Sequence, residues 1–207
     1  MRASSSAKRY LDSFFLLNSN SMVYSPSEDS FLLESELKKY LAGLSKEEKE
    51  SIKALDMGSG SGIQAKACIA GEIKRKNVIA ADIDKEAIQK LKDSRIPARK
   101  SNLFSNINKE KKFNLIIFNA PYLPSDKYDK KADTTAGKRG NEIILKFLRK
   151  AKPYLAENGV ILLLFSSLSR PEEIINYAIK RGYKTEKLSE KEVGMMERLF
   201  VYKLYFS

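Results

Sequence analysis

The sequence predicts an α/β fold built on one mostly parallel sheet with helices on both of its faces. From residue 52 onward, short apolar runs alternate with amphipathic stretches, which is the pattern of a βαβ protein. The run at residues 198–206 alternates too strongly for a helix and predicts a final strand. At 207 residues the chain fits one domain of ordinary size, in which roughly 70% of the unfolded chain's surface becomes buried.

The N-terminal residues differ from the rest of the chain. Residues 1–24 combine polar stretches with an apolar run at residues 10–17, and we interpret them as a short N-terminal extension. Residues 25–207 are expected to form a single domain.

Ser25, Pro26 and Glu28 predict the start of the first helix of that domain. Ser25 is expected to cap it, Pro26 to occupy the first helical position and Glu28 to complete a capping box. The helix should reach about Leu41, because the following Gly43 is a common stop signal.

Apolar runs and amphipathic stretches define the remaining elements. Strands are predicted at residues 53–57, 77–82, 113–118 and 160–165, with a weaker one at 98–102. Helices are predicted at residues 63–72, 84–93, 141–156 and 171–182, the last two closed by Gly159 and Gly182. Residues 184–188 should pair with the last strand, which gives seven strands and an antiparallel C-terminal strand. Met195 and Met196, between these two, are expected more often in the core than at a contact surface.

The composition excludes several classes of function. The chain has no histidine, so histidine-based triads, histidine general bases and Cys/His zinc sites are excluded, and we expect no metal. The single cysteine, Cys68, cannot form an internal disulfide. No segment approaches the ~20 apolar residues of a membrane helix, and the N-terminus lacks an apolar signal core. We therefore expect a soluble cytoplasmic protein without membrane contact.

The net charge is +12, from 38 Lys+Arg and 26 Asp+Glu. Such an excess can draw a chain towards RNA, ribosomes or acidic partner surfaces. Because the lysines are spread along the whole chain, a generally lysine-rich composition explains the charge equally simply.

A glycine-rich loop closes the first predicted strand. Gly58, Gly60 and Gly62 form a G-x-G-x-G pattern before a helix, where bare backbone can approach a ligand closely. The pattern departs from the dinucleotide fingerprint G-x-G-x-x-G and lacks the lysine of a P-loop. Both departures argue against a pyrophosphate ligand.

Acidic residues flank this loop. Asp82 ends the second strand about twenty residues later, where a carboxylate can accept both hydroxyls of a ribose. Asp56 precedes the glycines and is placed for a cationic amino group, whereas Asp84 has a good helix-capping role. Positions for a ribose and an ammonium group, without a basic residue for phosphate, favour S-adenosylmethionine as the ligand. NAD is the alternative.

Two polar positions follow the next strands. Asn102 could bond an adenine amino group and Leu103 could pack on its ring, although Asn102 also suits a simple turn. After residues 113–118 come Asn119, Ala120, Pro121 and Tyr122. The asparagine oxygen and the following carbonyl can accept the two hydrogens of a planar nitrogen, Pro121 stiffens the backbone, and the aromatic ring offers a stacking surface.

These motifs resemble those of the HemK-type S-adenosylmethionine-dependent methyltransferases, which modify the glutamine of peptide-chain release factors. The eukaryotic and archaeal branch of this family is the most similar. The resemblance is carried by residues 23–33, 55–62 and 119–122, while residues 136–142 are similar to a glycine-rich segment of the family. It implies a Rossmann-like class I methyltransferase fold.

The resemblance also implies a cofactor site and an acceptor site. The cofactor contacts that it implies are Ser30, Asp56, Gly58, Asp82, Asn102, Leu103 and Asn119, and we add Gly60 from the same loop. The catalytic residues would be Asn119, Ala120, Pro121 and Tyr122, with Asn119 and the Ala120 carbonyl holding the substrate carboxamide. The chain departs from the family at Ala120, where a first proline is usual, and at Ala136, where a glycine is usual.

The function implied is methyl transfer to the side-chain amide nitrogen of a release-factor glutamine, assisted by a small zinc-binding activator subunit. We would expect such a subunit at an exposed edge near residues 98–102. Two alternatives remain open. An adenine methyltransferase acting on RNA or DNA would present the same planar amine, and a non-catalytic RNA-binding module could keep the fold.

Overall fold

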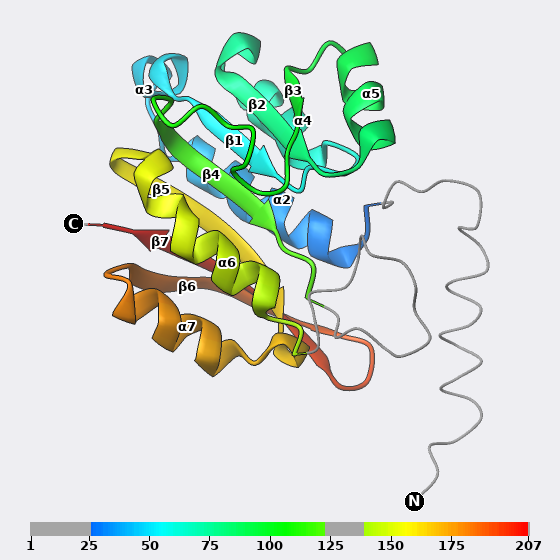
Figure 1. The fold of residues 1–207 in the computed structure, drawn as a ribbon, viewed down its shortest axis with the longest axis vertical. Coiled ribbons are helices and arrows are strands. Elements are labelled where there is room, and N and C mark those ends of the chain that lie inside the picture. Colours follow the sequence, from blue (N-terminus) through cyan, green and yellow to red (C-terminus); the bar gives the residue numbers. More distant parts are fainter. Residues whose placement is uncertain (1–25, 123–138, 207) are drawn as a thin grey trace, which may run out of the picture.

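The computed structural model describes residues 26–122 and 139–206 of the chain. Within these residues, seven strands form one sheet in the order β3-β2-β1-β4-β5-β7-β6 (Figure 1). The strands are β1 (Ala54–Met57), β2 (Val78–Asp82), β3 (Ala98–Lys100), β4 (Phe113–Asn119), β5 (Leu155–Ser166), β6 (Lys184–Val193) and β7 (Glu197–Tyr205). Strand β7 is antiparallel to both β5 and β6, whereas the pairs among β1 to β5 are parallel. The predicted fold class is confirmed.

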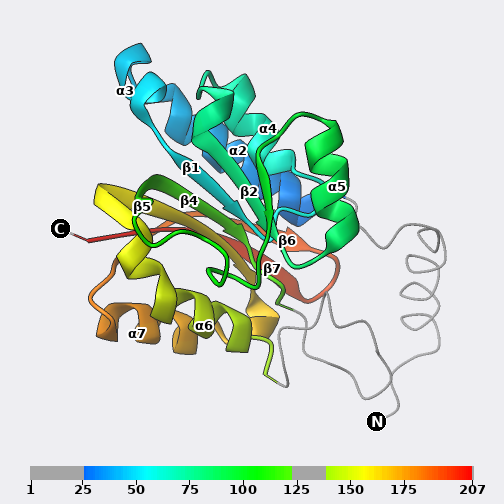
Figure 2. The same ribbon diagram turned by 45° about the horizontal axis from the view of Figure 1, so that its top comes forward.

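Helices cover both faces of the sheet. They are α2 (Glu28–Ala42), α3 (Lys46–Ser51), α4 (Ile63–Ala70), α5 (Lys85–Asp93), α6 (Glu142–Ala151) and α7 (Pro171–Lys180), with short 3-10 turns at Arg75–Asn77, Lys152–Tyr154 and Ser167–Ser169. Helices α6 and α7 lie together on one face (Figures 1 and 2). Helices α2, α4 and α5 pack on the other face, so the central strands β1, β4 and β5 are largely buried on both sides.

Strand β4 contributes side chains to the apolar clusters on both faces of the sheet. Phe113, Ile116 and Phe118 contribute to the cluster beneath α6 and α7, whereas Leu115 and Ile117 contribute to the cluster beneath α2, α4 and α5. Because side chains alternate between the faces of a strand, a strand buried on both faces has a nearly continuous apolar sequence. Asn119, the last residue of β4, is therefore a polar side chain that directly follows four buried apolar residues.

The first helix begins later than predicted. Helix α2 starts at Glu28 with Ser27 at the cap position, so Pro26 precedes the helix and the predicted position of the cap is wrong. Ser27 Oγ donates to Asp29 Oδ1 at 2.7 Å. Ser25 lies outside the described residues, as does the extension expected at residues 1–24. The end of the helix at Gly43 is confirmed.

The helix predicted at residues 141–156 is too long. Helix α6 ends at Ala151, because Pro153 lacks a backbone N–H and cannot continue it, and β5 already begins at Leu155. Gly159 is therefore a strand residue and not a helix stop. A Cβ atom there would lie 2.8 Å from the Phe113 carbonyl oxygen, which explains the glycine.

Two further features differ from the prediction. Helix α3 was not predicted, although Ser45 and Glu48 form a complete capping box at its start. Met195 and Met196 lie at the tip between β6 and β7 and are 100% and 91% exposed, so the expectation that they belong to the core is wrong. No helix within the described residues is long and apolar enough to cross a membrane.

Candidate cofactor and acceptor site

The motif residues lie at one edge of the sheet. Strand β1 lies between β2 and β4, and all three are parallel, so their carboxyl ends lie side by side. The chain moves outward from β1 to β2 and β3 and then returns to β4 on the other side of β1. Such a switch in strand order opens a crevice at the carboxyl ends, where α/β proteins bind ligands.

The glycines of the loop between β1 and α4 have positive φ angles, which residues with a side chain rarely adopt. Gly58 has a φ of 62°, and a Cβ atom there would lie 3.2 Å from the ring of Phe118. Gly62 has a φ of 73° at the cap of α4, and its Cβ would lie 2.3 Å from Leu91 Cδ2. Gly60 N donates to Asp82 Oδ2 at 2.7 Å, which ties the loop to the end of β2.

Asp82 is held in place by backbone amides. Its Oδ1 accepts a hydrogen bond from Asp84 N at 2.9 Å in addition to the Gly60 bond at Oδ2. Burial raises the pKa of Asp82 above its ordinary value, while these hydrogen bonds oppose the shift. A carboxylate offers about four acceptor positions, so Asp82 retains acceptor capacity for hydroxyl groups. Asp84 caps α5 as expected, with its Oδ1 accepting from Glu86 N.

Asp56 lies beneath the loop rather than at its surface. Its side chain is almost completely buried, and its Oδ2 accepts from Ala65 N at 2.9 Å in the first turn of α4. Burial raises the pKa of Asp56 to about 7, and the nearby Asp82 adds to the shift. A cationic ligand above the loop would oppose this shift by favouring the charged carboxylate.

This buried carboxyl predicts a specific dependence of stability on pH. The unfolded chain releases the Asp56 proton near 3.8, whereas the folded protein keeps it until about pH 7. The contribution of Asp56 to the free energy of unfolding is therefore most favourable below pH 3.8. It falls by about 4 kcal/mol in total between pH 3.8 and about pH 7 and stays low above that. Asp56→Asn should raise the melting temperature at pH 8 and leave it nearly unchanged at pH 4. Thermal melts at both pH values test this, with the exposed Asp93→Asn as control, and an equal gain at both would contradict it.

Residues 119–122, the expected acceptor site and here called the acceptor motif, form a polar cluster with the first turn of α2. Asn119 Nδ2 donates to Asp29 Oδ2 at 3.1 Å and to Ser30 Oγ at 3.3 Å. Tyr122 Oη donates to the same Asp29 oxygen at 3.3 Å. Asn119 Oδ1 is buried and has no hydrogen-bond partner among the described residues. Asp29 and Ser30, from the sequence motif 23–33, thus meet Asn119 and Tyr122 of the motif 119–122 in one site.

Ala120 continues the sheet hydrogen bonding beyond β4. Its backbone N donates to the Leu164 carbonyl of β5 at 3.3 Å, and its side chain is buried. A proline at this position would lack that donor. Pairing with β5 therefore restrains the backbone of this segment without the first proline of the family motif.

The residues after β3 lie beside the end of β2. Ser101 N donates to the Asp82 carbonyl at 2.7 Å, so this turn is anchored next to the acidic residue. Asn102 is exposed in the turn, and its backbone N donates to Ser105 Oγ. Leu103 has a φ of 51° and packs against the core cluster that contains Phe118.

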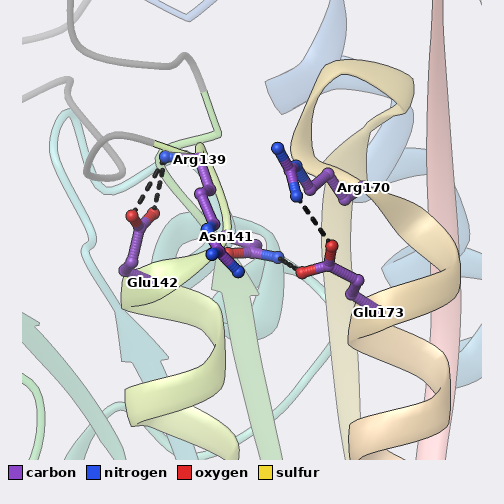
Figure 3. Close-up of polar contacts among 5 residues, drawn as sticks. All are labelled: Arg139, Asn141, Glu142, Arg170 and Glu173. Carbon is purple, nitrogen blue, oxygen red and sulfur yellow. Dashed lines mark hydrogen bonds and ion pairs between the residues drawn. The ribbon is translucent and has the colours of Figure 1, made fainter.

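The same edge carries a polar link between α6 and α7 that the sequence did not predict (Figure 3). Asn141 Nδ2 donates to Glu173 Oε2 at 3.0 Å, and Arg170 Nη1 donates to Glu173 Oε1 at 2.8 Å. Arg139 N donates to the Glu142 carboxylate at 3.0 Å. The bond between Asn141 and Glu173 joins the two helix starts, and the other two brace each start. This link lies at the end of the segment similar to the family's glycine-rich motif, of which Ala136, Gly137 and Lys138 lie outside the described residues.

The geometry suits S-adenosylmethionine. Within the described residues, the side-chain oxygens of Ser59, Gln64 and Asn119 are buried at this edge without a partner, which leaves acceptors for a ligand rich in donors. The glycine loop presents its backbone at this edge with Gly58 and Gly62 in the left-handed region. The carboxylates of Asp56 and Asp82 accept hydrogen bonds from Ala65 N and Gly60 N beside it. Among the described residues, no group of three or more His, Cys, Asp or Glu could hold a metal ion.

Comparison with known proteins identifies the family. The methyltransferase small domain model matches residues 37–191. A Methanocaldococcus jannaschii protein, whose name assigns it to the protein N5-glutamine methyltransferases, is 32% identical over 86% of this chain and 90% of its own length. The chain belongs to the protein N5-glutamine methyltransferase family. A release factor glutamine methyltransferase from Leptospira interrogans is 29% identical to this methyltransferase, over 95% of the chain and 72% of the relative.

Solved structures of methyltransferases share its fold. The E. cuniculi Mtq2-Trm112 complex, responsible for methylation of the eRF1 termination factor, contains a chain with a TM-score of 0.70 and 24% identity, over 90% of this chain and all of that one. A Bacteroides fragilis S-adenosylmethionine-dependent methyltransferase bound to S-adenosyl-L-homocysteine has a TM-score of 0.57 and 20% identity, over 84% and 77% of the two chains. The methyltransferase described here is an S-adenosylmethionine-dependent enzyme with the Rossmann-like class I fold.

Proposed function

We propose that this methyltransferase transfers a methyl group to the side-chain amide nitrogen of a glutamine in a peptide-chain release factor. The observation that carries the proposal is the buried Asn119 Oδ1, which faces no partner among the described residues although its amide nitrogen is fully engaged. An acceptor oriented in this way suits a substrate amide, whose nitrogen carries two hydrogens. The Leptospira interrogans relative, named for release factor glutamine methylation, supports the same substrate.

The residues would act mainly by positioning. An amide nitrogen is a poor nucleophile because its lone pair is shared with the carbonyl. If Asn119 Oδ1 and the Ala120 carbonyl accept its two hydrogens, electron density on the nitrogen rises and its plane is fixed. Pro121 stiffens the turn and Tyr122 packs against the carboxamide. Holding the nitrogen at ~3 to 3.5 Å from the methyl group provides much of the rate enhancement. The product nitrogen then loses its proton to water, so no histidine is needed.

S-adenosylmethionine supplies a methyl group already activated by the positive sulfonium. We propose that it lies over the glycine loop, held by the side chains and backbone of the predicted contact residues. These are Ser30, Asp56, Gly58, Gly60, Asp82, Asn102, Leu103 and Asn119. The carboxylate of Asp82 takes the ribose hydroxyls, while Asn102 and Leu103 take the adenine.

Mass spectrometry of release factor after reaction tests the proposed substrate. The enzyme, labelled S-adenosylmethionine and release factor should give a gain of one methyl group on one glutamine. Ribosomal RNA incubated in parallel tests the alternative that the pocket accepts an adenine amine. Label in RNA and none in release factor would contradict the proposal. In a thermal-shift titration the cofactor should stabilise the protein by about 2.7 kcal/mol at 100 times its Kd, and the absence of any shift would favour the non-catalytic alternative.

A small activator subunit, with its own zinc site, is proposed to bind the β3 edge. The E. cuniculi relative forms a complex with Trm112, and β3 is an outer strand of the sheet in this structure. The exposed residues of this short strand are Arg99 and Lys100, so a partner there should present acidic groups beside a strand edge. A purified enzyme that is monodisperse and fully active alone would contradict this partner.

A basic hollow offers a site for the proposed contact with RNA or the ribosome. It has a volume of about 280 Å³ and lies at the C-terminal ends of α6 and α7, away from the candidate site. Four cationic residues line it: Arg149, Lys152, Lys180 and Arg181. A phosphate backbone would neutralise charges that repel each other here.

Charge reversal at this hollow should weaken RNA binding without changing catalysis. The double variant Arg149→Glu with Lys180→Glu is expected to lower the affinity for RNA at least tenfold at low salt and to reduce its salt dependence. Filter binding at several salt concentrations measures this. Lys90→Glu with Lys92→Glu on α5 is a control of equal charge, and an equal loss in both variants would show that only net charge matters.

A further inference from the structure

Asp29 lies in the first turn of α2 and is 4% exposed, which is rare for an acidic side chain. Its two oxygens serve different neighbours. Oδ1 accepts from Ser27 Oγ at 2.7 Å and from Ser30 N at 2.6 Å, within its own helix start. Oδ2 accepts from Asn119 Nδ2 and Tyr122 Oη, at the end of β4. The carboxylate therefore joins the helix start to the acceptor motif.

This contact determines which end of the Asn119 amide faces the substrate. A carboxylate only accepts hydrogen bonds, so the NH₂ end of Asn119 must face Asp29, and its oxygen must point away. Ser30 Oγ accepts from the same Nδ2 at 3.3 Å, but a hydroxyl can also donate, so it is the Asp29 carboxylate that sets the orientation. The opposite rotamer would place two oxygens against each other in a buried site, where such a pairing is costly.

We propose that Asp29 is a positioning residue that fixes the amide orientation of Asn119 and thereby makes the site select an N–H donor over a carbonyl or carboxylate oxygen. This inference rests on the proposed glutamine substrate for its kinetic consequence. Glutamine and glutamate have nearly the same shape. With Asn119 Oδ1 facing the substrate, a glutamine amide is accepted, whereas the oxygens of a glutamate are repelled.

The variant Asp29→Asn reverses the orientation with a change of one atom. The backbone N–H of Ser30 can only donate, so it takes the oxygen of the new amide. The NH₂ end of residue 29 then faces Asn119, which turns its own oxygen towards it and its NH₂ group into the site. Turnover with a glutamine peptide should fall roughly 10²-fold, because the reacting nitrogen loses a fixed acceptor. S-adenosylmethionine affinity should stay within a few fold.

A specificity measurement distinguishes this role from a purely structural one. A peptide with glutamate at the reactive position should inhibit Asp29→Asn about ten times more strongly than it inhibits the native enzyme, because its carboxylate can accept from the turned NH₂ group. Glu36→Gln is the matched control. Glu36 is also buried on α2, but its carboxylate contacts Lys39 and not Asn119. We expect this control to match the native protein in turnover and in inhibition.

An NMR measurement tests the orientation without any substrate. In the native protein, the Asn119 side-chain amide protons should give nuclear Overhauser contacts to the Ser30 β protons, and these should disappear in Asp29→Asn. Absence of the contacts in the native protein, their persistence in the variant, or near-native turnover of the variant would overturn the inference. If the contacts behave as expected and the native enzyme leaves release factor unmodified, the proposed substrate is wrong and the orientation by Asp29 stands.

Discussion

Asn119→Ala is expected to lower methyl transfer roughly 10²- to 10³-fold while S-adenosylmethionine affinity changes only a few fold. The reason is that the side chain contributes mainly to the acceptor nitrogen. Removing Oδ1 leaves the substrate amide with one fixed acceptor, the Ala120 carbonyl, so its plane can rotate and its lone pair loses alignment. Alanine also leaves Asp29 Oδ2 with the Tyr122 hydroxyl as its donor, so the cluster should remain folded.

Calorimetric titration of the cofactor and a single-turnover transfer assay measure the two effects separately. Asn114→Ala is a matched control on the same strand. Asn114 Oδ1 accepts from Lys53 N at 3.0 Å at the opposite end of β4, so its loss affects the strand but not the site. Near-native turnover of Asn119→Ala, or an equal loss of turnover in both variants, would show that Asn119 does not hold the substrate amide.

The layout of the site could be predicted because parallel strands place their carboxyl ends at one edge. Gly58, Asp82 and Asn119 each follow an apolar run directly, so the strand pattern alone brought them to neighbouring strand ends. Local signals were sufficient for these residues. The cap at Asp84 and the end of the first helix at Gly43 were predictable for the same reason, since each depends on a few adjacent residues.

The role of Asp29 could not be predicted from local signals. An acidic residue in the first turn of a helix is common, because it interacts favourably with the helix dipole. Its actual partner, Asn119, is 90 residues away in the sequence. The same limit applies to the link between Asn141 and Glu173, which depends on how α6 packs beside α7. Contacts of this kind follow from tertiary packing.

Ala120 illustrates a substitution that the sequence alone could not evaluate. A family proline at this position would restrict the backbone through its ring, and alanine lacks that restriction. The structure provides a different restraint, the hydrogen bond from Ala120 N to the Leu164 carbonyl at 3.3 Å. This donor exists only because the residue is not proline, so pairing with β5 can replace ring stiffness.

Asp82→Ala is expected to weaken S-adenosylmethionine binding about 10²-fold, which corresponds to about 2.7 kcal/mol. Two hydroxyl hydrogen bonds to a charged acceptor account for a loss of this size, at about 1.5 kcal/mol each. The substitution also removes the acceptor of Gly60 N, so the glycine loop loses its tie to β2. Both effects act on the cofactor, and turnover at saturating cofactor should fall much less than affinity.

Asp84→Ala separates the binding role of Asp82 from the structural role of its neighbour. Asp84 is two residues away and caps α5 through Glu86 N at 2.8 Å, so its loss should cost about 1 kcal/mol of stability and leave cofactor affinity unchanged. Calorimetric titration and thermal melts of both variants give the comparison. The two acids are close in sequence but are expected to have different roles, one in cofactor binding and one in helix capping. A loss of affinity in Asp82→Ala alone supports the ribose assignment. Unchanged cofactor binding in Asp82→Ala rules it out.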